Sequence, residues 1–288
     1  MTSVIIPVYN GAGVLPRTLY SVIANNSPSE LLYVNDGSAD GTADLLAAAA
    51  HKVPRLQVVT LGENRGRAAA RNAGVAAARG DVLVFLDADV EPGPNAVEAL
   101  AEAVRQPGAV AAVARLAPVP DHPADPFQDY LAHHPRGPHP DLPPLASVDW
   151  RYFVTTACAV RRDAFEAAGG FPEGIRYGED TALACRLASA HPAGLRLADA
   201  TVRLHDLGDL SRALRHAAEF GRATRHLAEA CADGPLGPLL RARRLAPVAR
   251  SAAPALRAIV RRMPPGRFRR KAVRYLLAST ALAATRRA

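Results

Sequence analysis

Short apolar runs alternate with amphipathic stretches along the first ninety residues of the chain. Four apolar runs have the length of a strand, and each is followed by polar residues: 3–8, 31–34, 56–61 and 82–86. Between them, at 11–25, 40–50 and 66–79, apolar positions recur at helical spacing, with Asp40 as a candidate N-cap. Repeated strand–helix units predict an α/β fold with a doubly wound, mixed and mostly parallel sheet.

The rest of the chain predicts fewer strands and more helix. We expect a strand at 150–160, a helix from Arg162, a helix at 179–190, and a short strand ending at 204–205. Residues 117–146 contain nine prolines and four histidines, which favours a long loop or a flap over the substrate. Metal binding by these histidines is the alternative, but their spacing matches no ordinary site.

Basic residues are concentrated at the end of the chain, where helices are predicted for most of 210–288. Residues 234–288 contain 13 Arg, one Lys and no Asp or Glu, and the rest of the chain holds 21 basic and 27 acidic residues. Such helices can lie on an anionic membrane, or they can only pack on the body of the protein. Nucleic acid is not expected as a partner, because no recognition motif accompanies the charge.

Cysteine usage and hydropathy exclude other classes of protein. Three widely spaced cysteines, Cys158, Cys185 and Cys231, favour neither a disulfide framework nor a zinc finger. We expect no secretory signal and no membrane-spanning helix, since the chain has no apolar stretch of about 20 residues. A cytoplasmic location is expected, peripheral on the inner face of the membrane if the basic region binds lipid.

Two carboxylates, Asp87 and Asp89, directly follow the apolar run at 82–86. Ligands bind at strand ends in open α/β sheets. Carboxylates suit Mg²⁺ or Mn²⁺, which also bind phosphates; a solvated acidic loop is the alternative. Polar residues follow the other three runs at the same predicted edge: Tyr9, Asn10, Asp36, Glu63 and Asn64. The sequence therefore predicts a nucleotide site with a metal ion there.

Six segments, in order, resemble the family-2 inverting glycosyltransferases, which have the A-type glycosyltransferase fold. They are VIIPVYN (4–10), VNDGSADGT (34–42), ENRGRAAARNAG (63–74), VFLDAD (84–89), GGF (169–171) and GED (178–180). The resemblance implies metal-assisted single displacement, with Mn²⁺ or Mg²⁺, from a nucleotide-sugar, preferably a UDP-sugar, to an acceptor hydroxyl. We divide the chain into a nucleotide-sugar-binding and catalytic domain at 1–208 and a helical, Arg-rich region at 209–288, which would bring the enzyme near a lipid-linked acceptor.

The resemblance also implies roles for single residues. Donor-nucleotide binding falls to Pro7, Val8, Tyr9, Asn10, Asp36, Asn64, Arg67, Arg71, Asp87 and Ala88. Asp36 would accept the uracil N–H, in addition to opening a turn. For Tyr9 the alternative is an ordinary strand-end side chain, and for Arg71 it is a surface charge on an Ala-rich helix. Asp89 would bind the metal directly, Asp87 would contact the ribose or a metal-bound water, and His205 would be a further ligand.

Asp180 is implied as the general base for the acceptor hydroxyl, with Glu179 as the fallback. An acid that favours the dipole at the start of a helix is the alternative for both residues. Val90 departs from the family pattern, because members often have a further acid at this position. Residues 154–160 depart too, so sugar and acceptor recognition cannot be inferred from the resemblance.

Two other functions stay open. A sugar nucleotidyltransferase would need a Gly-rich phosphate loop with a basic residue after the first strand, and residues 10–13 have only part of it. A non-catalytic nucleotide-sugar-binding or scaffold protein is the other alternative. The presence of Asp36, Asp87, Asp89 and Asp180 argues against it.

Overall fold

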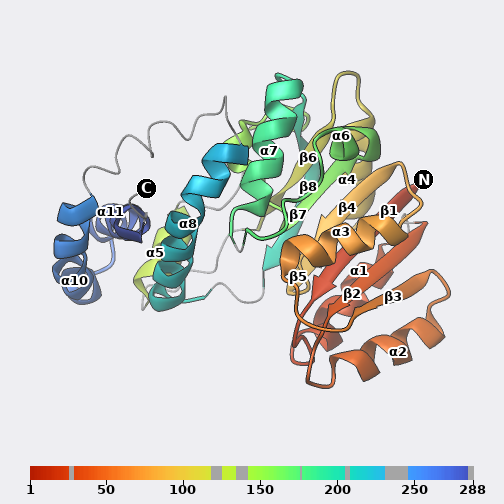
Figure 1. Ribbon diagram of the computed structural model, residues 1–288, viewed down its shortest axis with the longest axis horizontal. Helices are drawn as coiled ribbons and strands as arrows, with labels where there is room; N and C mark the ends of the chain where they lie inside the picture. Colours follow the sequence, from red (N-terminus) through yellow and green to blue (C-terminus); the bar gives the residue numbers. More distant parts are fainter. Residues whose placement is uncertain are drawn as a thin grey trace. The chain divides into compact units, whose positions relative to one another are not determined.

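The chain is divided into two compact units, which we describe separately (Figure 1). The computed structural model describes residues 1–25, 29–117, 125–133, 142–175, 177–204, 208–230 and 246–284. The first unit comprises Met1–Ala117, Gly137–Gly174 and Glu179–His205, and the second comprises Pro118–Arg136, Ile175–Gly178 and Asp206–Ala288. The domain boundary expected after residue 208 stays a prediction.

Within the described residues, the first unit is built on one eight-stranded sheet, in the order β3-β2-β1-β4-β7-β6-β8-β5. The strands are β1 (Thr2–Val8), β2 (Glu30–Asp36), β3 (Leu56–Leu61), β4 (Val82–Leu86), β5 (Val90–Pro92), β6 (Ala111–Leu116), β7 (Ala157–Arg161) and β8 (Leu195–Leu204). Strands β1 to β4 run parallel, as do β6 and β8, and β5 and β7 are antiparallel to their neighbours. The predicted fold class is confirmed.

Helices cover both faces of this sheet. Helices α1 (Leu15–Ala24), α2 (Thr42–Lys52) and α4 (Ala96–Arg105) pack on one face, and α3 (Arg67–Ala77), α6 (Arg162–Ala167) and α7 (Glu179–Ala190) pack on the other. Along β1, Val4 and Ile6 belong to the first core and Ile5 belongs to the second, since successive strand residues face opposite ways. A strand buried on both faces is apolar throughout, which explains the runs in the sequence.

The second unit is helical, with a small apolar core. Its helices are α5 (Pro126–His133), α8 (Leu210–Ala230), α10 (Ala246–Arg262) and α11 (Arg267–Ala284). Each helix contributes to the core, for example through Phe127, Leu214, Val260 and Leu276. None of the helices that the structure describes has both the length and the apolar character needed to cross a membrane.

The prediction of a strand over 150–160 is wrong in its first half. Residues Trp150–Tyr152 form a 3₁₀ turn, and the strand β7 begins only at Ala157. Asp149 caps the turn, because its side chain accepts the Arg151 N–H at 2.9 Å. A local hydrogen bond, from the Arg151 backbone to the Asp149 side chain, thus forms in place of the strand pairing that the apolar residues predicted.

One loop prediction and one helix-cap prediction also need correction. The loop expected at 117–146 contains α5, which Pro126 opens at a position where a missing N–H costs little. The Asp125 carboxylate accepts the Phe127 N–H at 2.7 Å and so stabilises this start. The N-cap of α2 is Gly41 rather than Asp40, although Asp40 accepts the N–H of Thr42.

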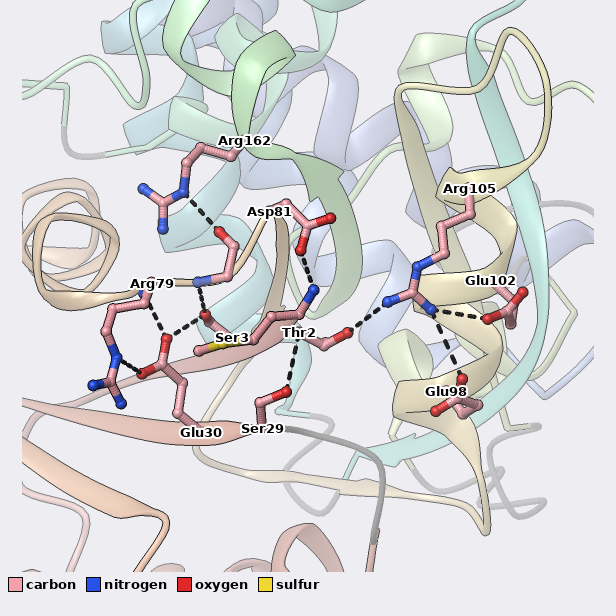
Figure 2. A network of polar contacts seen from close by, with 12 residues as sticks. Thr2, Ser3, Ser29, Glu30, Arg79, Asp81, Glu98, Glu102, Arg105 and Arg162 are labelled. Carbon is pink, nitrogen blue, oxygen red and sulfur yellow. Dashed lines mark hydrogen bonds and ion pairs between the residues drawn. The ribbon is translucent and has the colours of Figure 1, made fainter.

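A network of hydrogen bonds and ion pairs lies at the end of the sheet where the parallel strands begin (Figure 2). Glu30, the first residue of β2, accepts hydrogen bonds from the Ser3 hydroxyl at 2.5 Å and from the Arg79 N–H at 2.6 Å. Arg105 of α4 donates to the Thr2 hydroxyl at 3.2 Å. The predicted site residues Tyr9, Asp36 and Asp87 lie at the opposite end, where these strands finish.

Candidate active site

The ends of β1, β2 and β4 lie side by side at one edge of the sheet. Strand β1 pairs with both neighbours, with Val8 beside Asn35 and Ile5 beside Phe85. Pro7 and Val8 are buried residues of β1, whereas Tyr9 directly after them is 51% exposed. Tyr9 has the exposed side chain of the three, and donor binding by Pro7, Val8 and Tyr9 stays a prediction.

Asn10 ties the loop after β1 to the loop after β2. Its backbone N–H donates to the Ser38 hydroxyl at 3.0 Å, and its side-chain oxygen accepts the Ala39 N–H at 2.9 Å. The residue has a φ of 50°, in the left-handed region that Asn adopts more readily than most residues. The amide of Asn10 therefore shapes the rim of the site.

Asp36, the last residue of β2, holds the loop that precedes α3. Its two carboxylate oxygens accept the N–H groups of Arg65 at 2.8 Å and Gly66 at 2.9 Å, and the residue is 3% exposed. Each oxygen keeps a lone pair for another donor. Contact with a uracil N–H stays a prediction. The nearby candidates Asn64 and Arg67 are exposed at this loop.

Arg71 of α3 is completely buried and joins carboxylates from two other segments. Its Nη2 donates to Asp87 and its Nη1 donates to Glu179, each at 2.8 Å. Burial by itself would lower the pKa of Arg71, but the charges of Asp87 and Glu179 raise it above its ordinary value. The alternative of a surface charge is wrong for Arg71. Direct contact with the nucleotide stays a prediction.

Glu179 and Asp180 begin α7 beside this guanidinium. Glu179 is 3% exposed and Asp180 is partly exposed. Burial and the neighbouring Glu179 carboxylate raise the pKa of Asp180 to about 6, although Arg71 acts in the opposite direction. A carboxyl group that titrates at this pH can exchange protons under near-neutral conditions, as a general base must.

Asn72 fixes the turn that leads towards α7. Its Nδ2 donates to the Phe171 carbonyl at 2.8 Å, and its Oδ1 accepts the Phe171 N–H at 3.1 Å. The Phe171 ring packs edge-on against Phe85 of β4, with 5.1 Å between centroids. Our sequence analysis missed Asn72 as a site residue, although it lies in the matching segment 63–74, directly after Arg71.

The residues Asp87, Ala88 and Asp89 form the turn between β4 and β5, and all three are partly exposed. The Thr18 hydroxyl of α1 donates to the Ala88 carbonyl at 2.7 Å and so fixes the turn. Val90 is fully buried and pairs with Leu204 of β8. An acid at position 90 would carry a large desolvation cost in these surroundings.

The carboxylates of Asp87 and Asp89 fit the requirements of a hard divalent cation, which prefers oxygen ligands. Among the residues that the structure describes, no three His, Cys, Asp or Glu side chains are grouped to hold a metal ion. Hard cations of this kind commonly bind substrate phosphates and water in addition to protein carboxylates. His205, the third expected ligand, lies outside the described residues.

Comparison with known sequences gives one family match and several relatives. The model of the family "Glycosyl transferase family 2" matches residues 3–169, more than half of the chain. The undecaprenyl-phosphate 4-deoxy-4-formamido-L-arabinose transferase of Aeromonas hydrophila is 39% identical over 111 residues, 37% of this chain and 34% of that protein. The succinoglycan biosynthesis protein ExoO of Rhizobium meliloti is 36% identical over 113 residues, 39% of this chain and 32% of that protein. The matches thus span about a third of these relatives.

Solved structures share the fold at low sequence identity. The mannosyltransferase PcManGT from Pyrobaculum calidifontis, in complex with GDP-Man and Mn²⁺, has a TM-score of 0.59 and 22% identity, over 96% of this chain and 85% of its own. TarS 1–349 from S. aureus, in complex with UDP-GlcNAc, has a TM-score of 0.57 and 18% identity, over 81% of this chain and 70% of its own. Asp180 lies beyond the segment that the family model matches.

Proposed function

Because the chain belongs to glycosyltransferase family 2, we propose that it moves a sugar from a nucleotide-sugar donor to an acceptor hydroxyl. The observation that carries the proposal is the buried ion-pair network in which Arg71 links Asp87 to Glu179, next to Asp180 with its raised pKa. One guanidinium thereby connects the candidate metal-binding turn to Glu179, the residue next to the candidate base Asp180. The UDP-GlcNAc and GDP-Man complexes of proteins with this fold support a nucleotide-sugar donor, and we propose a UDP-sugar.

We assign Asp180 as the general base. Its ionised carboxylate takes the proton from the acceptor hydroxyl while that oxygen forms a bond to the anomeric carbon of the sugar. The bond from this carbon to the diphosphate breaks in the same step, on the opposite face, so the configuration inverts. Glu179 is the weaker candidate because it is almost fully buried and already accepts a hydrogen bond from Arg71.

Asp87 and Asp89 would hold a Mg²⁺ or Mn²⁺ ion, with His205 proposed as a further ligand from its sequence position. Such an ion supplies positive charge that stabilises a departing nucleoside diphosphate. Arg71 orients the Asp87 carboxylate through its 2.8 Å hydrogen bond. We propose contacts to the donor for the exposed residues of the same edge, Tyr9, Asn64 and Arg67.

For the acceptor we propose a lipid-linked molecule. The relative from Aeromonas hydrophila is named as an undecaprenyl-phosphate transferase, and the uniformly basic segment 234–288 suits an anionic membrane surface. The reaction would then take place on the cytoplasmic face of a membrane, with the enzyme bound peripherally.

The exchange Asp180→Asn tests the assignment of the base. Release of nucleoside diphosphate from a panel of nucleotide-sugars, with water as the slow acceptor, needs no knowledge of the natural acceptor. We expect a loss of at least about a hundredfold in turnover, since a positioned base contributes roughly 10²–10⁴-fold. Donor affinity, measured by calorimetry, should stay within a few-fold of wild type.

Glu166→Gln serves as the matched control, because Glu166 is an exposed carboxylate of α6. It should leave both turnover and donor affinity unchanged. Near-normal turnover in Asp180→Asn would remove Asp180 from the role of base.

A further inference from the structure

Helix α11 has two different faces. Its inner face packs into the core of the second unit through Val273 and Leu276. The same face carries Arg269, which is 4% exposed and donates to Asp129 of α5 at 2.9 Å. The core contacts and the buried ion pair of this helix are therefore all on its inner face.

The outer face of α11 combines cations with aromatic rings. It consists of Arg267, Phe268, Lys271, Arg274 and Tyr275, all of which are exposed. Positions three, four and seven apart share one side of a helix, so these side chains form a single patch. We refer to these five residues as the basic–aromatic face.

The two rings of the basic–aromatic face are unusually open to solvent. Phe268 is 66% exposed and Tyr275 is 59% exposed, and they lie two turns apart along the helix. The Arg267 guanidinium lies 4.7 Å from the centre of the Phe268 ring. Large apolar side chains that are not part of a core and lie together on one exposed face indicate an interaction surface.

The charge around these rings has one sign. In the part of the chain that the structure describes, no carboxylate pairs with Arg267, Lys271 or Arg274, whereas Arg269 and Arg270 both pair with Asp129. Residues 234–288 contain no acid at all. Ordinary soluble surfaces mix charges of both signs, so the partner of this face is expected to be anionic.

We infer that the basic–aromatic face docks the protein on an anionic lipid bilayer. The three cations are drawn to the negative surface potential of such a membrane. Phenylalanine and tyrosine rings insert at the level of the head groups, where their apolar bodies leave water. The inference deepens the lipid-linked acceptor of the proposed function, but vesicle binding needs neither donor nor acceptor, so the two can fail separately.

Sedimentation with vesicles tests the docking surface on the full chain. Wild type should bind vesicles of phosphatidylglycerol and phosphatidylcholine, bind pure phosphatidylcholine weakly, and dissociate in high salt. The triple variant R267Q/K271Q/R274Q should bind the anionic vesicles about a hundredfold more weakly, since each cation near the surface contributes roughly fivefold. The double variant F268A/Y275A should bind the anionic vesicles about tenfold more weakly, or less tightly still.

The control variant is Tyr20→Ala, because Tyr20 of α1 is an aromatic residue that is 79% exposed on the first unit. It should bind vesicles like wild type. Equal vesicle binding by wild type and the triple variant would overturn the inference. So would tighter binding of wild type to a single-stranded oligonucleotide than to the anionic vesicles under the same salt.

A fluorescent reporter shows which face contacts the lipid, whatever the affinity for the vesicles. The chain has one tryptophan, Trp150, whose signal can be subtracted. In Phe268→Trp, brominated lipids should quench the new fluorophore on vesicle binding, whereas Tyr20→Trp should not be quenched. Quenching at position 20 but not at position 268 would show that another surface faces the lipid.

Discussion

At the scale of single residues, Arg71 determines the charge state of the candidate site. A fully buried guanidinium needs carboxylate partners, and Asp87 and Glu179 supply them from two segments far apart in the sequence. The same positive charge lowers the pKa of Asp180, which burial and Glu179 raise. The pH at which Asp180 becomes a base thus depends on the charge of Arg71. Within the described part of the chain, no hydrogen bond joins the two side chains.

Replacing Arg71 by methionine should therefore change both pH dependence and stability. Without the cation, the pKa of Asp180 rises further, so the ascending limb of kcat/KM against pH should move to higher pH. Loss of one partner from buried ion pairs should also cost about 3–5 kcal/mol in the free energy of unfolding. Arg71→Lys keeps the charge and should leave the limb near its original pH.

Arg105→Met is the control, since Arg105 is a partly exposed arginine at the opposite edge of the sheet. Its pH profile should match that of wild type. If the ascending limb of kcat/KM stays at the same pH in Arg71→Met, Arg71 does not influence the pKa of the base.

Asp180 should carry a cost in stability that depends on pH. Its folded-state pKa of about 6 lies above its ordinary value, so the folded protein binds the proton more tightly than the unfolded chain. Stability then decreases as pH rises from about 4 to about 6, and the full cost is present above that range. Asp180→Asn should raise the free energy of unfolding by roughly 1–3 kcal/mol at pH 8 and by little at pH 4.

Denaturant unfolding at the two pH values measures this difference. Asp44→Asn, an exposed acid in the first turn of α2, is the control and should show no gain at pH 8. A gain of equal size at both pH values for Asp180→Asn would contradict a raised pKa.

At the scale of elements, the loops after the strands are held by backbone geometry that composition does not reveal. Gly37 has a φ of 67°, and a Cβ atom at this position would lie 2.4 Å from the backbone carbon of Glu63. Only glycine fits there, because the loop after β2 touches the loop that Asp36 holds. The rim of the candidate site thus depends on one residue without a side chain.

Gly37→Ala should accordingly destabilise the protein by about 2–4 kcal/mol and weaken donor binding, since a left-handed residue gains a side chain that meets backbone. Gly13→Ala is the matched control, because nothing lies within 4 Å of a Cβ atom built at Gly13. Thermal unfolding and donor titration of both variants measure the difference. Equal effects of the two exchanges would contradict this role of Gly37.

The bounds predicted for β3 and β4 agree with the observed ones. Strand β4 is buried throughout, whereas β3 is an edge strand with partly exposed residues, so its apolar run alone gave the prediction. The three-residue strand β5 is too short to give a periodic signal, and our sequence analysis made no prediction for it. Helix α5 lies in a Pro-rich segment, where composition favoured a loop. Asn72 was missed because its role comes from contacts with Phe171, which is 99 positions away.

At the scale of the whole molecule, the chain combines an α/β unit with a basic helical unit. The sequence does not show which apolar residues of the basic unit are packed and which are exposed. In the structure Val260 and Leu276 are buried, whereas Ile259 and Tyr275 are more than half exposed. Burial of Arg269 was equally hidden, because its partner Asp129 comes from a segment 140 residues earlier.

Stability of the whole molecule also reports on its ligand, because a molecule that binds only the folded state raises the melting temperature. The proposed function places a nucleotide-sugar site with a divalent cation at Asp87 and Asp89. The most direct measurement is a thermal-shift panel of UDP, GDP, dTDP and CDP, each with and without Mn²⁺ or Mg²⁺, on wild type and on Asp89→Asn. We predict a shift for one nucleotide, UDP by preference, that requires the metal and disappears in Asp89→Asn. No shift with any nucleotide, or a shift that neither the metal nor Asp89 affects, would contradict the account.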